Sequence, residues 1–228
     1  MSVYVIGDTH LSFSTNKPMN VFDGWDNYVE RLERNWQKLI TDDDIIVING
    51  DVSWAMNLEE AKADLYFLDK LKGKKIIAKG NHDYWWNTVT KMNAFLKDND
   101  ITTISFLFNN AYCFDDFAIA GSRGWFFDAE DDNQVLLREC GRLQRSIDMA
   151  KEYMKEIVVF LHYPPVSDGK DCKAIVDTLL ENNIKYCYYA HLHGPAHKFA
   201  FNGEKYGINF KLVSADYLKF CPQIVKIN

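Results

Sequence analysis

Cysteine is scarce in this sequence, and its spacing forms no pattern. The 228 residues include five cysteines, an odd number, and no two of them form a Cys-x-x-Cys pair. This argues against a small secreted domain held together by a disulfide framework. We expect a reduced, cytoplasmic protein whose thiols are small buried side chains.

Long apolar runs are also missing. No segment approaches the roughly 20 apolar residues of a membrane-spanning helix, so we expect no membrane partner. Met1 leads almost directly into the apolar run 3–6 with no basic segment before it. We therefore expect no signal peptide.

The sequence has no excess of positive charge. Its formal net charge is −6, so a long nucleic-acid duplex would be repelled unless a basic stripe compensated locally. The one basic cluster consists of Lys70, Lys72, Lys74 and Lys75, which we interpret as a solvated connection between a helix and a strand. Long nucleic acids are not expected as partners.

Apolar residues, in contrast, are abundant. Hydrophobic residues make up 47% of the chain and aromatic residues 14%, which is enough for one sizeable core and too much for a disordered chain. We find no repeat, low-complexity stretch or linker. Residues 1–228 are expected to form a single layered α/β domain.

Strands and helices alternate in the first half. Buried strands are predicted at 3–6, 45–48 and 75–78, and helices at 26–40 and after the N-cap residue Asn57. For the second half we predict a β meander over 103–108, 111–114 and 117–121, helices at 136–154 and 174–180, strands at 157–161 and 185–190, and a hairpin turn at Asn202-Gly203. We interpret the acidic runs 42–44 and 128–132 as solvated loops or helix starts.

Carboxylates, imidazoles and one amide follow the predicted strands. In order, they lie in Gly7-Asp8-Thr9-His10, Gly50-Asp51, Gly80-Asn81-His82-Asp83, His162 and His191-Leu192-His193. In open α/β sheets, ligands bind at the carboxyl ends of the strands. Such a mixture of oxygen and imidazole donors suits Mn, Fe, Zn, Co or Ni.

Each of these segments is weak evidence alone. Asp-x-His is common by chance, a lone buried histidine is usually a core residue, and Gly-Asn-His-Asp is also a turn sequence. The ordered set is much more specific, because every member falls at a predicted strand end. The sixth histidine, His197, has no such partner, and we interpret it as structural or superficial.

The series from Asp8 to His193 resembles the calcineurin-like metallophosphoesterase superfamily, and the long segment 11–22 with the surrounding tryptophans resembles a bacterial branch of predicted phosphohydrolases. The resemblance implies an α/β fold of four layers, an α/β/β/α sandwich in which two mixed β-sheets are flanked by helices. Family members usually have glycine where this chain has Ala190. We expect a modest backbone adjustment there.

By position, the resemblance implies two divalent metal ions. Asp8, His10 and His193 would hold one, Asn81, His162 and His191 would hold the other, and Asp51 would bridge both. The implied enzyme is a phosphohydrolase that cleaves a phosphate monoester or diester by attack of metal-bound hydroxide. Because Asn81 is neutral, two carboxylates against two divalent cations leave an excess of positive charge that attracts phosphate.

The resemblance also implies two catalytic residues. His82 would face the substrate and act as general acid or stabilise developing charge. Asp83 would orient His82 and keep it cationic.

Five further side chains are candidates for substrate contact. Arg123 has forked donors that suit a phosphate or carboxylate, with a surface turn arginine as the alternative. Trp54, together with Trp85, Trp86 and Trp125, is a candidate aromatic rim for a nucleobase or apolar leaving group, although core packing is the expected role of at least two of them.

Three classes of function compete. The leading hypothesis is a hydrolase acting on a small phosphorylated substrate. A nuclease or protein phosphatase is disfavoured by the acidic charge and compact length. A non-catalytic metal-binding interaction scaffold is disfavoured because all seven ligand positions and His82 are filled. The sequence leaves metal identity, substrate and oligomeric state open.

Overall fold

Two β-sheets stack face to face in the computed structural model of the chain, which describes residues 1–125 and 133–227. Within these residues the first sheet has the strand order β11-β1-β2-β3-β4 and the second the order β5-β6-β7-β8-β10-β9. The strands of the first sheet are β1 (Val3–Ile6), β2 (Ile45–Asn49), β3 (Lys74–Ala78), β4 (Ile104–Leu107) and β11 (Gln223–Ile224). Those of the second are β5 (Tyr112–Cys113), β6 (Phe117–Ser122), β7 (Glu156–Leu161), β8 (Tyr186–Tyr189), β9 (Gly203–Lys205) and β10 (Ile208–Leu212).

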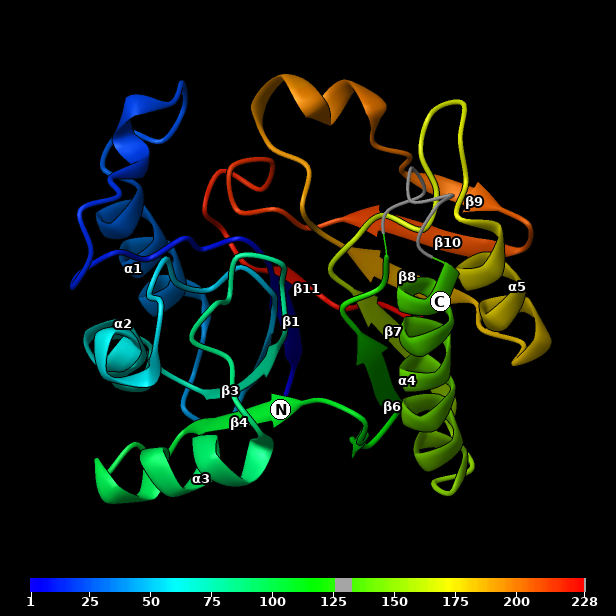
Figure 1. Cartoon of the computed structure of the whole chain (residues 1–228), viewed down its shortest axis with the longest axis horizontal. Coiled ribbons are helices and arrows are strands. Elements are labelled where there is room, and N and C mark those ends of the chain that lie inside the picture. The colour runs from blue at the N-terminus through cyan, green and yellow to red at the C-terminus, as the bar shows by residue number, and fades with distance from the viewer. Residues whose placement is uncertain (126–132, 228) are drawn as a thin grey trace.

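Helices cover the outer face of each sheet (Figure 1). The helices on the first sheet are α1 (Tyr28–Leu39), α2 (Leu58–Lys70) and α3 (Val89–Asp98), and those on the second are α4 (Asn133–Lys151) and α5 (Lys173–Glu181). Two short 3-10 helices, η1 (Met19–Val21) and η2 (Gly194–Phe199), lie in connecting segments. The expected four-layered α/β/β/α sandwich with two mixed sheets is confirmed, because β1–β4 and β6–β8 run parallel while β11, β5 and β9 pair antiparallel.

Local sequence explains why the helices form where they do. The buried residues Leu32 and Trp36 give α1 one apolar face at helical spacing. The side chain of Asn57 caps α2 by accepting the backbone N–H of Glu60 at 3.0 Å. A third cluster of buried residues, which includes Val47 from β2 and Phe160 from β7, fills the space between the sheets.

Two predictions of secondary structure are wrong, and one helix was missed. The segments 103–108, 111–114 and 117–121 form no meander, because β4 joins β3 in the first sheet whereas β5 and β6 pair in the second. The last hairpin turns at Tyr206-Gly207 and not at Asn202-Gly203. Both turn residues have positive φ, 58° and 75°, as a type I′ turn requires. The helix α3 was not predicted.

The acidic runs and the lysine cluster also differ in part from expectation. Asp44 is buried and its carboxylate accepts the backbone N–H groups of Ser2 and Thr41, so only part of the run 42–44 is solvated. The run 128–132 lies outside the described residues. Lys75 is fully buried, unlike the solvated lysine that we expected.

The parallel strands bring the predicted site residues to one edge of the sandwich. The strands β1, β2 and β3 are followed directly by Gly7, Gly50 and Lys79, and β7 and β8 by His162 and Ala190. The backbone N–H of Ala190 donates to the carbonyl of His162 at 3.0 Å, and that of Gly7 donates to the carbonyl of Val213 at 2.7 Å. The first hydrogen bond joins the ends of the neighbouring strands β8 and β7, and the second links the first sheet to the second.

Lys75 provides a test of how the first sheet is joined to α2. Its ammonium donates to the carbonyls of Leu71 and Gly73, the latter at 2.8 Å, and to the hydroxyl of Thr103 at 3.0 Å. Replacing Lys75 by alanine leaves buried carbonyls without a donor and opens a cavity. We therefore expect Lys75→Ala to lower the free energy of unfolding by about 2–4 kcal/mol in urea denaturation. The exposed neighbour Lys74 is the control, and Lys74→Ala should change it by less than about 0.5 kcal/mol; equal effects would contradict this role.

Candidate metal centre

The first loop of the site follows β1 and carries two of the predicted ligands. Asp8 and His10 are buried and adopt the left-handed conformation, with φ of 57° and 42°. Their backbone N–H groups donate to the carbonyls of Gly50 and Asp51, at 2.9 and 3.0 Å. Non-glycine residues in this conformation cost about 1–3 kcal/mol each and gather at functional sites. The fold therefore maintains strain in order to turn both side chains inward.

The second loop follows β2 and holds Asp51, which also has a positive φ, 50°. Its Oδ1 accepts the backbone N–H of His82 at 2.7 Å. A Cβ at Gly80 would overlap the Asp51 carboxylate and backbone, so only glycine fits there. The Gly-Asp and Gly-Asn-His-Asp segments are thus spaced to pack against each other.

Ala190, the departure from the family pattern, is accommodated by Gly7. A Cβ placed on Gly7 would lie 2.7 Å from the Cβ of Ala190, so the strand ends approach closely only because residue 7 is glycine. His191, which follows Ala190, has φ of 75°, and its backbone N–H donates to Asp8 Oδ2 at 2.9 Å.

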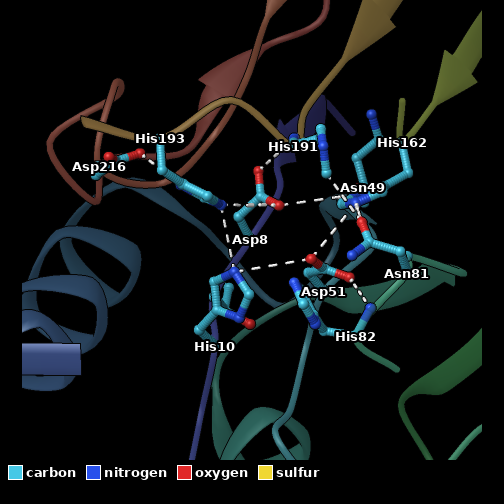
Figure 2. A network of polar contacts seen from close by, with 12 residues as sticks. Asp8, His10, Asn49, Asp51, Asn81, His82, His162, His191, His193 and Asp216 are labelled. Atoms are coloured by element: carbon cyan, nitrogen blue, oxygen red, sulfur yellow. Dashed lines mark hydrogen bonds and ion pairs between the residues drawn. The ribbon is translucent and has the colours of Figure 1, made fainter. Parts of the chain in front are cut away.

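One group of donors consists of Asp8, His10 and His193 (Figure 2). His193 Nε2 lies 3.4 Å from Asp8 Oδ1 and 3.3 Å from His10 Nε2. Two imidazole nitrogens and a carboxylate oxygen from distant parts of the chain therefore face a common point. This is the set that the family resemblance implies for one ion.

A second group consists of Asp51, His162 and His191, with Asn81 among them. Asn81 Oδ1 lies 2.8 Å from His162 Nε2 and 2.9 Å from His191 Nδ1. Asp51 Oδ2 lies 3.4 Å from His162 Nε2 and 3.8 Å from His10 Nε2, so it stands between the two groups. The structure brings all seven predicted ligands together.

The charges of the site call for cations. Asp8 Oδ1 and Asp51 Oδ2 are buried and accept no hydrogen bond from the described residues. Burial alone would raise the pKa of Asp51, yet the adjacent His162 holds it below its ordinary value. Against the cost of burial, the charge of Asp51 raises the pKa of His162 to about 9, and that of Asp8 raises the pKa of His193 to about 10.

The other two imidazoles behave oppositely, because burial lowers the pKa of both His10 and His191 to about 4. Neutral imidazoles beside unpaired carboxylate oxygens are the forms that bind a divalent ion. Both groups of donors therefore fit divalent metal ions. Each contains a buried carboxylate oxygen that accepts no hydrogen bond from the described residues, and both combine oxygen with imidazole ligands.

Asp83 does not orient the ring of His82, contrary to expectation. Its buried carboxylate accepts the backbone N–H groups of Gly80, Asp51 and Val52, at 2.8, 3.0 and 2.8 Å, and the indole N–H of Trp85 at 3.0 Å. Burial and then the charge of Asp51 raise the pKa of Asp83 to about 6. Asp83 is therefore a positioning residue that holds the Asp51 loop against the Gly80 loop.

His82 itself lies at the site, half-buried beside the first group of donors. Its ring centroid is 5.8 Å from that of His10 and 4.6 Å from that of Trp54. Burial lowers its pKa, which is opposite to the cationic state expected from Asp83. The hydroxyl of Tyr84 lies 3.4 Å from His82 Nδ1 and contacts the ring from outside.

The four tryptophan candidates separate into site and core. Trp54 stacks on His10, with centroids 4.7 Å apart, and so lines the site. Trp85 is buried, and Trp86 packs on Phe106, so these two are not part of a rim. Trp125 lies beyond the site and faces Arg123, whose guanidinium carbon is 4.9 Å from the ring.

Arg123 is neither a free anion clamp nor a simple surface arginine. Its Nη2 lies 3.2 Å from Oε1 of the buried Glu139, which sequence reasoning did not single out.

Sequence reasoning also missed Asp216. One oxygen of its carboxylate lies 3.1 Å from His193 Nδ1 and 3.2 Å from His197 Nε2, and the other accepts the backbone N–H of Gly194 at 2.9 Å. These contacts hold the His193 ring with Nε2 toward Asp8. His197, interpreted as structural, thus supports the site through Asp216. Asp216 follows β10, and its position after a strand end was the available signal.

We expect Asp216→Ala to weaken binding at one of the two candidate metal sites. Without the carboxylate, His193 loses its fixed orientation, and affinity for one ion should fall by about 10- to 100-fold while the other is retained. Isothermal titration of the metal-free protein with Mn²⁺ or Zn²⁺ measures the affinity of each site. Asp171→Ala is the control, because Asp171 pairs with Lys205 at 2.7 Å away from the donors. Unchanged affinity, or equal weakening of both sites, would contradict this role.

Comparison with known proteins agrees with this geometry. The family model described as calcineurin-like phosphoesterase matches residues 1–195. A probable cyclic nucleotide phosphodiesterase of Xenorhabdus bovienii is 23% identical over 86% of this chain and 79% of its own length. An uncharacterised protein of Methanocaldococcus jannaschii is 30% identical over 86 residues, which are 36% of this chain and 46% of the relative, so the match spans under half of that relative.

Solved structures share the fold at low identity. The phosphopantetheinyl hydrolase of Mycobacterium tuberculosis has a TM-score of 0.60 and 15% identity, covering 100% of this chain and 96% of the other. A protein of unknown function from Aquifex aeolicus has a TM-score of 0.51 and 17% identity, covering 98% and 95%. On the evidence of the family match, the chain belongs to the calcineurin-like phosphoesterases, which are metal-dependent phosphoester hydrolases.

Proposed function

We propose that this protein is a dinuclear metal phosphohydrolase that cleaves a monoester or diester of a small molecule. The observation that carries the proposal is the position of Asp51 Oδ2, which lies within 3.8 Å of imidazole nitrogens from both donor groups and accepts no hydrogen bond from any residue that the structure describes. A buried carboxylate oxygen placed between two sets of ligands is suited to bridge two cations. We assign Asp8, His10 and His193 to one ion, Asn81, His162 and His191 to the other, and Asp51 to both.

Bound divalent ions would supply a nucleophile at neutral pH and stabilise charge on the phosphoryl oxygens. The protein sets the charge of the site through its donors. Four imidazoles and one amide add no negative charge, so the two carboxylates Asp8 and Asp51 leave the site positive when two divalent ions are present. A phosphate is thus attracted despite the net charge of −6.

We assign proton transfer to His82. Its Nδ1 faces the hydroxyl of Tyr84, so Nε2 is the atom that would pass a proton to the leaving oxygen. The lowered pKa makes its imidazolium a readier proton donor. Trp54 stacks on His10 and packs at a tilted angle against His82, which fixes the rings and excludes water from one side of the site.

A nuclease or protein phosphatase would need a docking surface, and no observation favours one. The names of two relatives, a phosphodiesterase and a phosphopantetheinyl hydrolase, support including diesters in the substrate panel. The five cysteines are free thiols, which supports our proposal of a cytoplasmic location. No helix among the described residues is long and apolar enough to span a bilayer.

The role of His82 is tested by His82→Ala. We expect turnover of p-nitrophenyl phosphate or its bis ester to fall by roughly 10²–10⁴, the range for loss of general acid–base help, with two metal ions retained per chain. Tyr84→Phe, which removes only the hydroxyl beside Nδ1, should reduce turnover by less than about tenfold. Loss of metal from the His82→Ala protein would show that His82 is a ligand instead.

The bridging role of Asp51 is tested against Asp8. Asp51→Asn should lower the metal content of both sites, because one oxygen contacts both groups, whereas Asp8→Asn should lower that of one. Elemental analysis after dialysis against a limiting metal buffer measures the content. Two tightly bound ions in the Asp51→Asn protein would refute the bridge, and a wild-type protein that binds no metal and cleaves no ester would refute the proposed function.

A further inference from the structure

A cluster of three cations surrounds one buried carboxylate close to the candidate metal centre. Lys79 follows β3, Arg123 follows β6, and Glu139 and Arg142 lie one turn apart on α4. Glu139 Oε1 lies 3.2 Å from Arg123 Nη2 and 2.5 Å from Arg142 Nη1. Two guanidinium groups therefore share one carboxylate oxygen.

The cluster is not neutral. Lys79 lies within electrostatic range of Arg123, Arg142, Glu139 and Asp83. Three cations against these two carboxylates leave an excess of about one positive charge. Lys79 is partly buried, yet its ammonium makes no hydrogen bond or ion pair with any part of the chain that the structure describes. Partly buried charges are normally paired, because desolvation without a partner costs free energy. A structural ion pair for Glu139 would need only one cation, so the extra charge calls for another explanation.

The cluster adjoins the second group of metal-site donors. Tyr163 adjoins both, with its ring centroid 4.6 Å from that of His191 and 6.0 Å from the guanidinium carbon of Arg123. The backbone N–H of Tyr163 donates to the carbonyl of Arg123 at 2.9 Å, which fixes the spacing. Lys79 is two residues before Asn81. An anion at the cluster would thus lie within the span of one small molecule bound at the metal centre.

The guanidinium of Arg123 is already positioned for such a ligand. Glu139 holds one end, and the ring of Trp125 lies 4.9 Å from its central carbon. An arginine held by an ion pair and by stacking loses little freedom when it binds an anion with its remaining donors. Arg123 is 22% exposed, so part of the group remains accessible.

We propose that Lys79 and Arg123 form a subsite for a second anionic group of the substrate, and that the substrate is a phosphate ester whose organic part carries a further phosphate. The proposal rests on the proposed function, since the metal centre must hold the scissile group. We assign the scissile phosphate to the metal-site donors and the second anionic group to this subsite, which adjoins those donors through Tyr163.

The test compares ligands that differ by one phosphate. Hydrolysis of p-nitrophenyl phosphate, or of its bis ester if that is preferred, is inhibited with adenosine 5′-monophosphate, adenosine 5′-diphosphate and adenosine 3′,5′-bisphosphate. At least one ligand with two phosphates should inhibit the wild-type enzyme about tenfold or more better than the monophosphate. Lys79→Met keeps the length of the side chain and orphans no partner. It should remove most of that preference, and Arg123→Lys should reduce it.

Lys97→Met is the control, because Lys97 is exposed in the last turn of α3 and its replacement changes net charge equally. It should leave the preference intact. A wild-type enzyme with no preference for a second phosphate, or a preference that Lys79→Met does not alter, would overturn the subsite while leaving the proposed function standing. Absence of any ester hydrolysis would instead count against the proposed function.

Discussion

The burial of two carboxylates, Asp8 and Asp51, is the constraint around which the rest of the site is built. Each has an oxygen that no described residue satisfies with a hydrogen bond, and the two carboxylates repel each other. Such an arrangement is unfavourable unless cations compensate for it. The left-handed backbone at both residues maintains this conformation, as do the backbone N–H groups that donate to the carboxylate of Asp83. The local strain therefore points to a site whose charge is completed by metal ions.

The two sheets contribute different halves of the site. Asp8, Asp51 and Asn81 follow strands of the first sheet, whereas the histidines after β7 and β8 come from the second. The distances between ligands from the two sheets depend on how closely the sheets pack. At one strand end, the close approach of Gly7 to Ala190 sets the spacing between the sheets. Packing of the apolar layer between the sheets is therefore part of the geometry of the site.

The sequence was most informative where chemistry is local. Strand ends that carry Asp, Asn and His could be recognised because metal donors are few in kind and parallel strands end at a common edge. Contacts such as Asp216 with His193, or Glu139 with Arg123, depend on tertiary packing that no spacing encodes. Lys75 shows the same limit, since its burial depends on carbonyls at the end of α2. The strand β4 was misplaced because local sequence does not say which sheet a strand joins.

The two sides of the candidate metal centre carry different side chains, and this difference sets the orientation of the proposed substrate. On the side of His10 lie His82, to which we assign proton transfer, and the aromatic face of Trp54. On the side of His191 lie Tyr163 and, beyond it, the cations around Glu139. A leaving oxygen needs a proton, and a second phosphate needs positive charge. In our proposal the scissile phosphate therefore lies between these sides, with its leaving group toward His82 and its second anionic group toward Arg123.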